Sequence, residues 1–168
     1  MIILQTQRLT LRELTLDDAD FILALLNDPD FIRFIGDRNV RSVEDARKYL
    51  KGPIESYERN GFGLWMVENK AGTPLGICGL IKRDSLPDVD IGYAFLPEFR
   101  SQGYAFEAAN ASFAFARDTL KLSRLLAIVS PENDRSIRLL EKLGMKFERM
   151  FTMPNDNEEL KLFAVNFT

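Results

Sequence analysis

The sequence predicts a mixed α/β fold in which a mostly antiparallel sheet of about seven strands is flanked by about four helices. Strand-like runs, alternating or continuously apolar, recur along the chain, and segments that open with helix-capping residues separate them. In addition, 46% of the 168 residues are apolar, which is enough to fill one sizeable core. We therefore expect residues 1–168 to form a single domain.

The chain opens with a strand and a helix. Residues 8–14 read RLTLREL, and this alternation of apolar and polar side chains is typical of a half-buried strand. Thr15 follows, with Asp18 three residues later, which is the spacing of a capping box. These residues predict a strand that leads directly into a first helix.

A second helix is predicted after an interruption at Pro29. Ser42, with Asp45 three residues further on, again has the form of an N-terminal cap, and the helical pattern continues to about Asn60. Pro53 lies inside this segment, so we expect the helix to bend or to divide there.

Three strand-like runs come next. They cover residues 62–69, 75–82 and 89–96, and turns rich in glycine, proline and aspartate separate them. Because short connections most simply join antiparallel neighbours, the three runs predict a meander.

The last part of the chain alternates between helices and strands. A helix rich in alanine and phenylalanine starts after Gly103, a buried strand is expected over residues 124–130, and a further helix over residues 133–144 ends at a glycine. The runs MKFERMFTM and ELKLFAVNF then predict a hairpin around residues 154–157.

Charge and composition argue against several classes of function. The net charge is −3, the pI is near 5.1 and the basic residues are scattered, which argues against binding to nucleic acid or to a membrane surface. With one cysteine and no histidine, we expect no internal disulfide, no metal site and no Ser-His or Cys-His pair. The N-terminus does not have the form of a signal peptide, so a cytoplasmic location is expected. A monomer or a homodimer is expected.

The stretch PEFRSQGYAFEA places an arginine and a glycine directly before a helix. The first N–H groups of a helix lack intrahelical partners and lie at the positive end of its dipole, so they can cradle an anion. Gly103 permits a close approach, and the small Ala105 leaves room for a phosphate over the first turn. On the motif alone, a solvated Arg100 and a glycine that merely starts the helix are supported equally well.

A second polar pair follows the strand predicted at residues 124–130. Asn133 and Ser136 open the next helix, and the predicted strand order brings them beside the cradle. Either residue alone fits an ordinary helix cap. Together, at this separation, the two patterns indicate one ligand site.

These residues resemble the GCN5-related N-acetyltransferases, the GNAT family, and within them the RimJ/RimL-like branch that acetylates the N-terminal amines of ribosomal proteins. The resemblance covers nearly the whole chain, from TQRLTLREL through DVDIGYAFLPEFRSQGYAFEA to ENDRSIRLLEKLGMKFE. It implies the GNAT fold and an acetyltransferase that uses acetyl-CoA. It also implies a set of cofactor-binding residues: Ala94 and Phe95 on the central strand, Arg100, Ser101, Gln102, Gly103, Tyr104, Ala105 and Phe106 in the cradle, and Asn133 near the pantetheine arm.

The catalytic residues transfer less directly. The family often has a tyrosine as general acid in the helix after the asparagine, and members acting on N-terminal amines can carry a glutamate in the preceding strand. This chain has Leu140 and Ile128 at those positions. Asp90 remains as a candidate base that takes the amine proton through a water, or alternatively as a structural acceptor at a strand end. Ser130 is a second candidate, for a polar contact to substrate or water.

The lack of a histidine and of the family tyrosine favours an α-amine as acceptor, because direct attack on a thioester requires a neutral amine. Reference pKa values of about 7.8 and about 10.4 leave about one in three α-amines neutral near pH ~7.5, but only about one in a thousand lysines. The acceptor cleft is expected between the first two helices and the hairpin at residues 153–157, with Phe31, Arg33 and Phe34 as binding residues.

Two alternatives stay open beside an N-acetyltransferase for protein or peptide N-termini. The first is an enzyme that acetylates a small-molecule amine, such as a polyamine, an amino acid or an antibiotic. The second is a non-catalytic acyl-CoA-binding sensor that keeps the cradle and lacks the chemistry.

Overall fold

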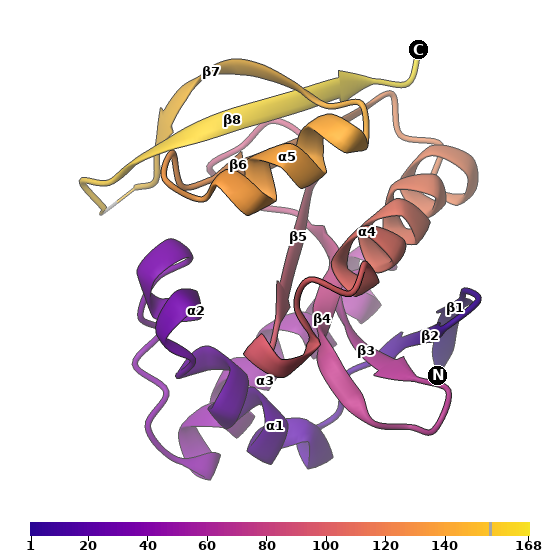
Figure 1. Ribbon diagram of the computed structural model, residues 1–168, viewed down its shortest axis with the longest axis vertical. Helices are drawn as coiled ribbons and strands as arrows, with labels where there is room; N and C mark the ends of the chain where they lie inside the picture. The colour runs from indigo at the N-terminus through magenta and orange to yellow at the C-terminus, as the bar shows by residue number, and fades with distance from the viewer. Residues whose placement is uncertain (155) are drawn as a thin grey trace.

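A computed structural model of the chain describes residues 1–154 and 156–168, so Asn155 of the predicted hairpin lies outside the described residues (Figure 1). Among the described residues, eight strands form one sheet in the order β1-β2-β3-β4-β5-β6-β8-β7. Their bounds are β1 (Ile2–Gln5), β2 (Leu9–Glu13), β3 (Leu64–Asn69), β4 (Pro74–Ile81), β5 (Asp90–Phe95), β6 (Arg124–Val129), β7 (Lys146–Thr152) and β8 (Glu159–Asn166). Every neighbouring pair is antiparallel except β5 and β6.

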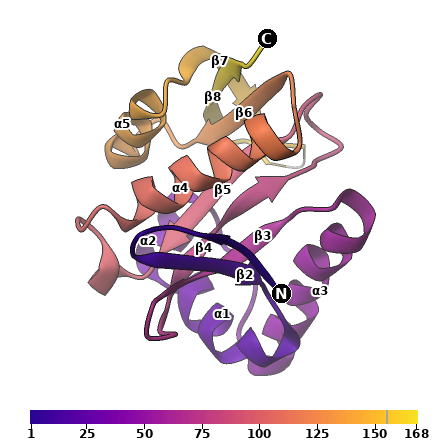
Figure 2. The ribbon, with the colours of Figure 1, turned by 90° about the vertical axis from the view of Figure 1, so that its right-hand side faces the viewer.

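In the described part of the chain, five α-helices cover the sheet, and none is long and apolar enough to cross a lipid bilayer. They are α1 (Ala19–Leu26), α2 (Pro29–Phe34), α3 (Val43–Asn60), α4 (Tyr104–Ala114) and α5 (Asp134–Lys142), with shorter helical turns at Leu16–Asp18, Pro97–Phe99 and Phe115–Thr119. Along β3, Trp65 and Val67 pack into the core beneath α4 and α5, whereas Met66 packs against α1 and α3. Figure 2 shows α4 crossing the sheet, with α1 and α3 gathered away from it.

The helix signals in the sequence are confirmed. Thr15 and Asp18 form the capping box, which opens a short 3₁₀ turn before α1. Ser42 caps α3, and its Oγ accepts a hydrogen bond from the backbone N–H of Asp45 at 3.1 Å. The expected division at Pro53 does not occur, because α3 is one helix from Val43 to Asn60.

The structure contains one strand and one helix that the sequence pattern did not predict, β1 and α2. The additional strand is a short edge strand of four residues. In α2, Asp28 Oδ2 accepts a hydrogen bond from the backbone N–H of Phe31 at 3.2 Å, and Pro29 occupies the first turn. Proline is favoured at the first helical position, so the Asp-Pro pair starts a helix here rather than only interrupting the chain.

The parallel strands β5 and β6 separate soon after they meet. Among the described residues, their only aligned pair is Asp90 with Leu126. On its other edge β5 pairs with β4 along its whole length. Backbone groups of successive residues point alternately to the two edges of a strand, and Leu96 N–H donates to Leu75 O on the β4 side at 3.1 Å. The backbone groups of Tyr93 and Phe95 therefore face the gap between β5 and β6.

Candidate functional site

The turn before α4 presents a row of free backbone donors. The N–H groups of residues 101–106 have no acceptor among the described residues, and the helix begins with the bond from Glu107 N–H to Gly103 O at 3.0 Å. Ser101 and Gly103 have left-handed backbones, with φ of 62° and 83°. Residues that alternate in this way turn successive N–H groups toward one side, and such a nest binds anions. The predicted cradle thus has the geometry of a phosphate site.

The Arg100 side chain lines the cradle cavity but is held by acceptors outside the cradle. Its guanidinium donates to Asp28 Oδ2 at 2.6 Å, to Asp30 Oδ2 at 2.7 Å and to Phe95 O at 2.9 Å. Its backbone N–H donates to Pro97 O at 3.2 Å. The side chain that was expected to open the cradle therefore fastens the start of α2 to the end of β5.

Two cavities meet beside the cradle. The first, of about 570 Å³, is lined by the cradle residues other than Gln102 and by one side of α5, and we name it the cradle cavity. The second, of about 840 Å³, reaches along β5 and β6 to Asp90, and we name it the carboxylate cavity. Both are lined by Phe31, Phe34, Ile35, Tyr93, Ala94, Asn133 and Ser136. A ligand held in the cradle and a ligand entering beside Asp90 therefore have a common meeting point.

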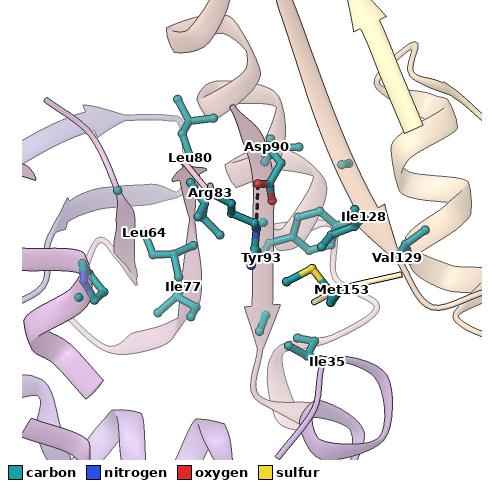
Figure 3. Close-up of a pocket in the computed structure, with 18 of the residues that line it drawn as sticks. Ile35, Leu64, Ile77, Leu80, Arg83, Asp90, Tyr93, Ile128, Val129 and Met153 are labelled. Carbon is teal, nitrogen blue, oxygen red and sulfur yellow. Dashed lines mark hydrogen bonds and ion pairs between the residues drawn. The ribbon is translucent and has the colours of Figure 1, made fainter. Parts of the chain in front are cut away.

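A pair of hydroxyl groups lies at this junction. Tyr93 Oη and Ser136 Oγ are 2.6 Å apart, and Asn133 Oδ1 accepts the backbone N–H of Ser136 at 3.3 Å. Figure 3 shows the Tyr93 ring extending from β5 toward Ile128 on β6. Burial raises the pKa of Tyr93, so its hydroxyl keeps its proton at neutral pH. Tyr93 is not among the residues that the sequence predicts for the site, although its position within DIGYAF, on the strand before the cradle, is a signal.

Asp90 carries the buried carboxylate of the site. Its side chain is 1% exposed, and Oδ1 accepts a hydrogen bond from Arg83 Nε at 2.9 Å (Figure 3). Its other oxygen, Oδ2, is buried without a partner among the described residues. Burial raises the pKa of Asp90 to about 6, although Arg83 opposes the rise. A carboxylate with a pKa near neutrality and one free oxygen is well suited to accept a proton.

Of the other residues predicted for the site, three line a cavity and one does not. Ser130 is 5% exposed and lines the carboxylate cavity. Phe31 and Phe34 line both cavities. Arg33 lines neither: its side chain is 63% exposed, lies over the Phe34 ring and forms a 3.9 Å ion pair with Glu132.

Apolar side chains surround the carboxylate cavity between these polar groups. Leu140 and Ile128, which stand where an acid and a base are expected, are both part of its lining. Figure 3 shows further apolar side chains from β3, β4, β6, the end of α2 and the β7–β8 connection: Leu64, Ile77, Leu80, Val129, Ile35 and Met153. Apolar side chains therefore line much of the carboxylate cavity between its polar groups.

Comparison with known proteins finds acetyltransferases in both sequence and structure. The model of the acetyltransferase (GNAT) domain family matches residues 8–146. The Bacillus subtilis N-acetyltransferase YoaA is 31% identical over 151 residues, which cover 87% of this chain and 84% of YoaA. The Escherichia coli [ribosomal protein uS5]-alanine N-acetyltransferase is 28% identical over 101 residues, covering 58% of this chain and 52% of that protein. The structure of RimL, a ribosomal L7/L12 α-N-protein acetyltransferase in complex with coenzyme A, is similar with a TM-score of 0.86 at 17% identity, covering 99% of this chain and 98% of that one.

Proposed function

Because the chain belongs to the GNAT family of acetyltransferases, we propose that this acetyl-CoA-dependent N-acetyltransferase modifies the α-amine of a peptide or protein N-terminus. The proposal is supported by a buried carboxylate with a free oxygen, which lines a cavity that meets the cradle cavity. It is also supported by the named activity of two similar proteins, which acetylate ribosomal proteins. We further propose that residues 1–168 act as one catalytic domain.

The cradle cavity has the features required to hold acetyl-CoA, which supplies the acetyl group as an activated thioester. The free N–H groups of residues 101–106 would bind the pyrophosphate. The gap beside β5 would offer the backbone groups of Tyr93 and the N–H of Phe95 to the pantetheine arm, because Phe95 O is already held by Arg100. Phe95 lines the cradle cavity, where its N–H would stabilise a developing oxyanion, and Asn133, which lines both cavities, would lie beside the arm.

Two sets of side chains would move the protons. Above pH ~6, Asp90 Oδ2 is ionised and accepts the proton of the incoming amine, directly or through a water. At the junction, Ser136 Oγ and Tyr93 Oη hold protons at neutral pH and would supply one to the departing thiolate. This pair takes the place of the tyrosine that Leu140 replaces.

The lining of the carboxylate cavity favours an amine with an apolar body over a polyamine. Its charged residues are four cations and four acids: Arg38, Arg59, Lys82, Arg83, Glu55, Asp90, Asp156 and Glu158. A polycation would therefore meet no excess of negative charge. Ile35 is 42% exposed at the junction, where an apolar first side chain of a peptide would cover it.

The first prediction concerns the product. Incubation with acetyl-CoA and a mixed panel of peptides, spermidine, amino acids and aminoglycosides should give peptides acetylated at the α-amine, as detected by mass spectrometry. Acetyl-CoA at about 100 times its Kd should raise the free energy of unfolding by about 2.7 kcal/mol. Stabilisation without any product would identify an acyl-CoA sensor, and acetylated spermidine or aminoglycoside alone would identify a small-molecule enzyme.

The second prediction concerns the pH dependence. Above the Asp90 pKa of about 6, kcat/KM should rise with the neutral fraction of the amine and level off near the pKa of that amine. The plateau should come near pH ~8 for a peptide α-amine and near pH ~10 for a lysine side chain. The measurement is kcat/KM against pH for two peptides, one with a free N-terminus and one blocked there but carrying lysine. Identical profiles for both amines would contradict this account.

A further inference from the structure

The β1–β2 turn brings an arginine against the backbone of the cradle. Arg8 Nη1 donates to Gln102 O at 3.0 Å, and the guanidinium carbon lies 4.4 Å from the centre of the Tyr104 ring. A Cβ added to Gly103 would lie 3.2 Å from Arg8 Nη2. Three successive cradle residues thus lie against one side chain from near the N-terminus. Figure 2 shows the β1–β2 turn beside the start of α4.

The same arginine is paired with the carboxylate in the first turn of α4. Glu107 Oε1 accepts a hydrogen bond from Arg8 Nε at 2.7 Å, and Oε2 accepts from Arg8 N–H at 2.9 Å and from Thr6 Oγ at 2.5 Å. Although burial alone would raise the pKa of Glu107, these bonds lower it, so the group is ionised at neutral pH. A second anion close by would be repelled unless this charge is balanced.

We propose that Arg8 is a positioning residue for the pyrophosphate: it fixes the cradle through Gln102 O and Tyr104 and cancels the charge of Glu107. The inference rests on the proposed binding of acetyl-CoA in the cradle. Ser101 has a left-handed backbone, which residues other than glycine rarely adopt, so support from outside helps to hold the nest. The Arg8 side chain is 42% exposed, which keeps it at the surface of the site rather than in the core.

The test compares ligands that share the pantetheine arm and differ in their phosphates. The Arg8→Gln variant should bind both CoA and 3′-dephospho-CoA about tenfold more weakly, as expected for loss of a charged hydrogen bond, by calorimetry. Its kcat/KM with acetyl-pantetheine, which has no pyrophosphate, should be unchanged. Removing the charge of Glu107 as well, in Arg8→Gln/Glu107→Gln, should restore part of the affinity.

Other outcomes overturn the inference. Unchanged CoA affinity excludes a positioning role, an equal loss with acetyl-pantetheine indicates a general effect on the fold, and a loss with CoA but not with 3′-dephospho-CoA indicates a contact to the 3′-phosphate. Should Arg8→Gln fail to fold, Arg8→Lys keeps the charge without the planar fork and should show an intermediate loss with both phosphorylated ligands. Arg117→Gln makes the same charge change in the helical turn Phe115–Thr119, beyond the far end of α4, and should leave the affinity unchanged.

A cradle variant separates this inference from the proposed function. Ala105 lies in the first turn of α4, where proline removes one free N–H at little cost to the helix. If Ala105→Pro weakens CoA binding and Arg8→Gln does not, only the role of Arg8 is wrong. If neither variant weakens it, the pyrophosphate lies elsewhere and the proposed cofactor placement is wrong as well.

Discussion

The Asp90→Asn variant is expected to lose about 10²- to 10⁴-fold in kcat/KM, the range typical of removing a general base. Asparagine keeps an oxygen for Arg83 Nε but cannot take a proton from the amine. In the parent enzyme kcat/KM should also fall as the pH drops below about 6, where Asp90 becomes protonated. The variant should lack this acidic limb, as measured by kcat/KM between pH ~5 and ~9 on one peptide.

The same substitution should stabilise the fold at neutral pH. A carboxyl whose pKa rises from 3.8 to about 6 on folding binds its proton more tightly in the folded state, so its contribution favours folding at low pH and is lost as the pH rises through that interval. At about 1.4 kcal/mol per pKa unit, the ionised group costs the parent about 3 kcal/mol above pH ~6. Asp90→Asn removes that cost, and urea unfolding at pH ~7.5 should show a gain of about 1 to 3 kcal/mol.

Two control variants identify the titrating group. Arg83→Gln removes the cation that lowers the pKa of Asp90, so the acidic limb should move above pH ~6. Asp84→Asn makes the same chemical change as Asp90→Asn at an exposed position of the β4–β5 loop and should leave the profile unchanged. A modest loss of activity in Asp90→Asn with the acidic limb intact would make Asp90 a structural acceptor.

Replacing Arg100 with alanine is expected to destabilise the protein by about 3 kcal/mol, because it removes one partner of a buried ion pair. The Asp28 side chain is 6% exposed and would retain only its hydrogen bond from the Phe31 N–H. The start of α2 would loosen, and with it the wall formed by Phe31 and Phe34. The KM for the peptide should therefore rise more than the Kd for CoA, measured by kinetics and calorimetry.

The exposed arginine of α2 provides the matched control for Arg100→Ala. Arg33→Ala removes a 3.9 Å ion pair at the surface, and its effect on the free energy of unfolding should stay below about 0.5 kcal/mol. Unchanged stability in Arg100→Ala, together with a tenfold or greater loss of CoA affinity, would instead make Arg100 a direct phosphate ligand.

Local signals in the sequence were sufficient for most of the fold. The caps at Thr15 and Ser42 and the turn at Gly103 each depend on neighbours only a few residues away, so the pattern shows them directly. The family resemblance then supplied the fold and the cofactor. The short strand β1 escaped prediction because its place in the sheet comes from pairing with β2 rather than from alternation.

The parts of the site that the sequence did not show all depend on contacts over long distances in the chain. Arg8 and Glu107 are 99 residues apart, and Arg100 and Asp28 are 72 apart. Tyr93 was visible as a strand residue, but its pairing with Ser136 is a property of the packed sheet and helix. Spacing rules describe a single turn or strand, so they cannot identify such partners.

The single aligned pair between β5 and β6 also has a mechanical consequence. It divides the sheet of the described residues into a body of β1 to β5 and a body of β6 to β8, joined at Asp90 and Leu126. Rotation of one body against the other would pivot at that joint and change the width of the gap between β5 and β6, beside Tyr93 and Phe95. A group on the pivot is displaced least. The carboxylate of Asp90 would therefore keep its position relative to the incoming amine while the far end of the gap widens and narrows.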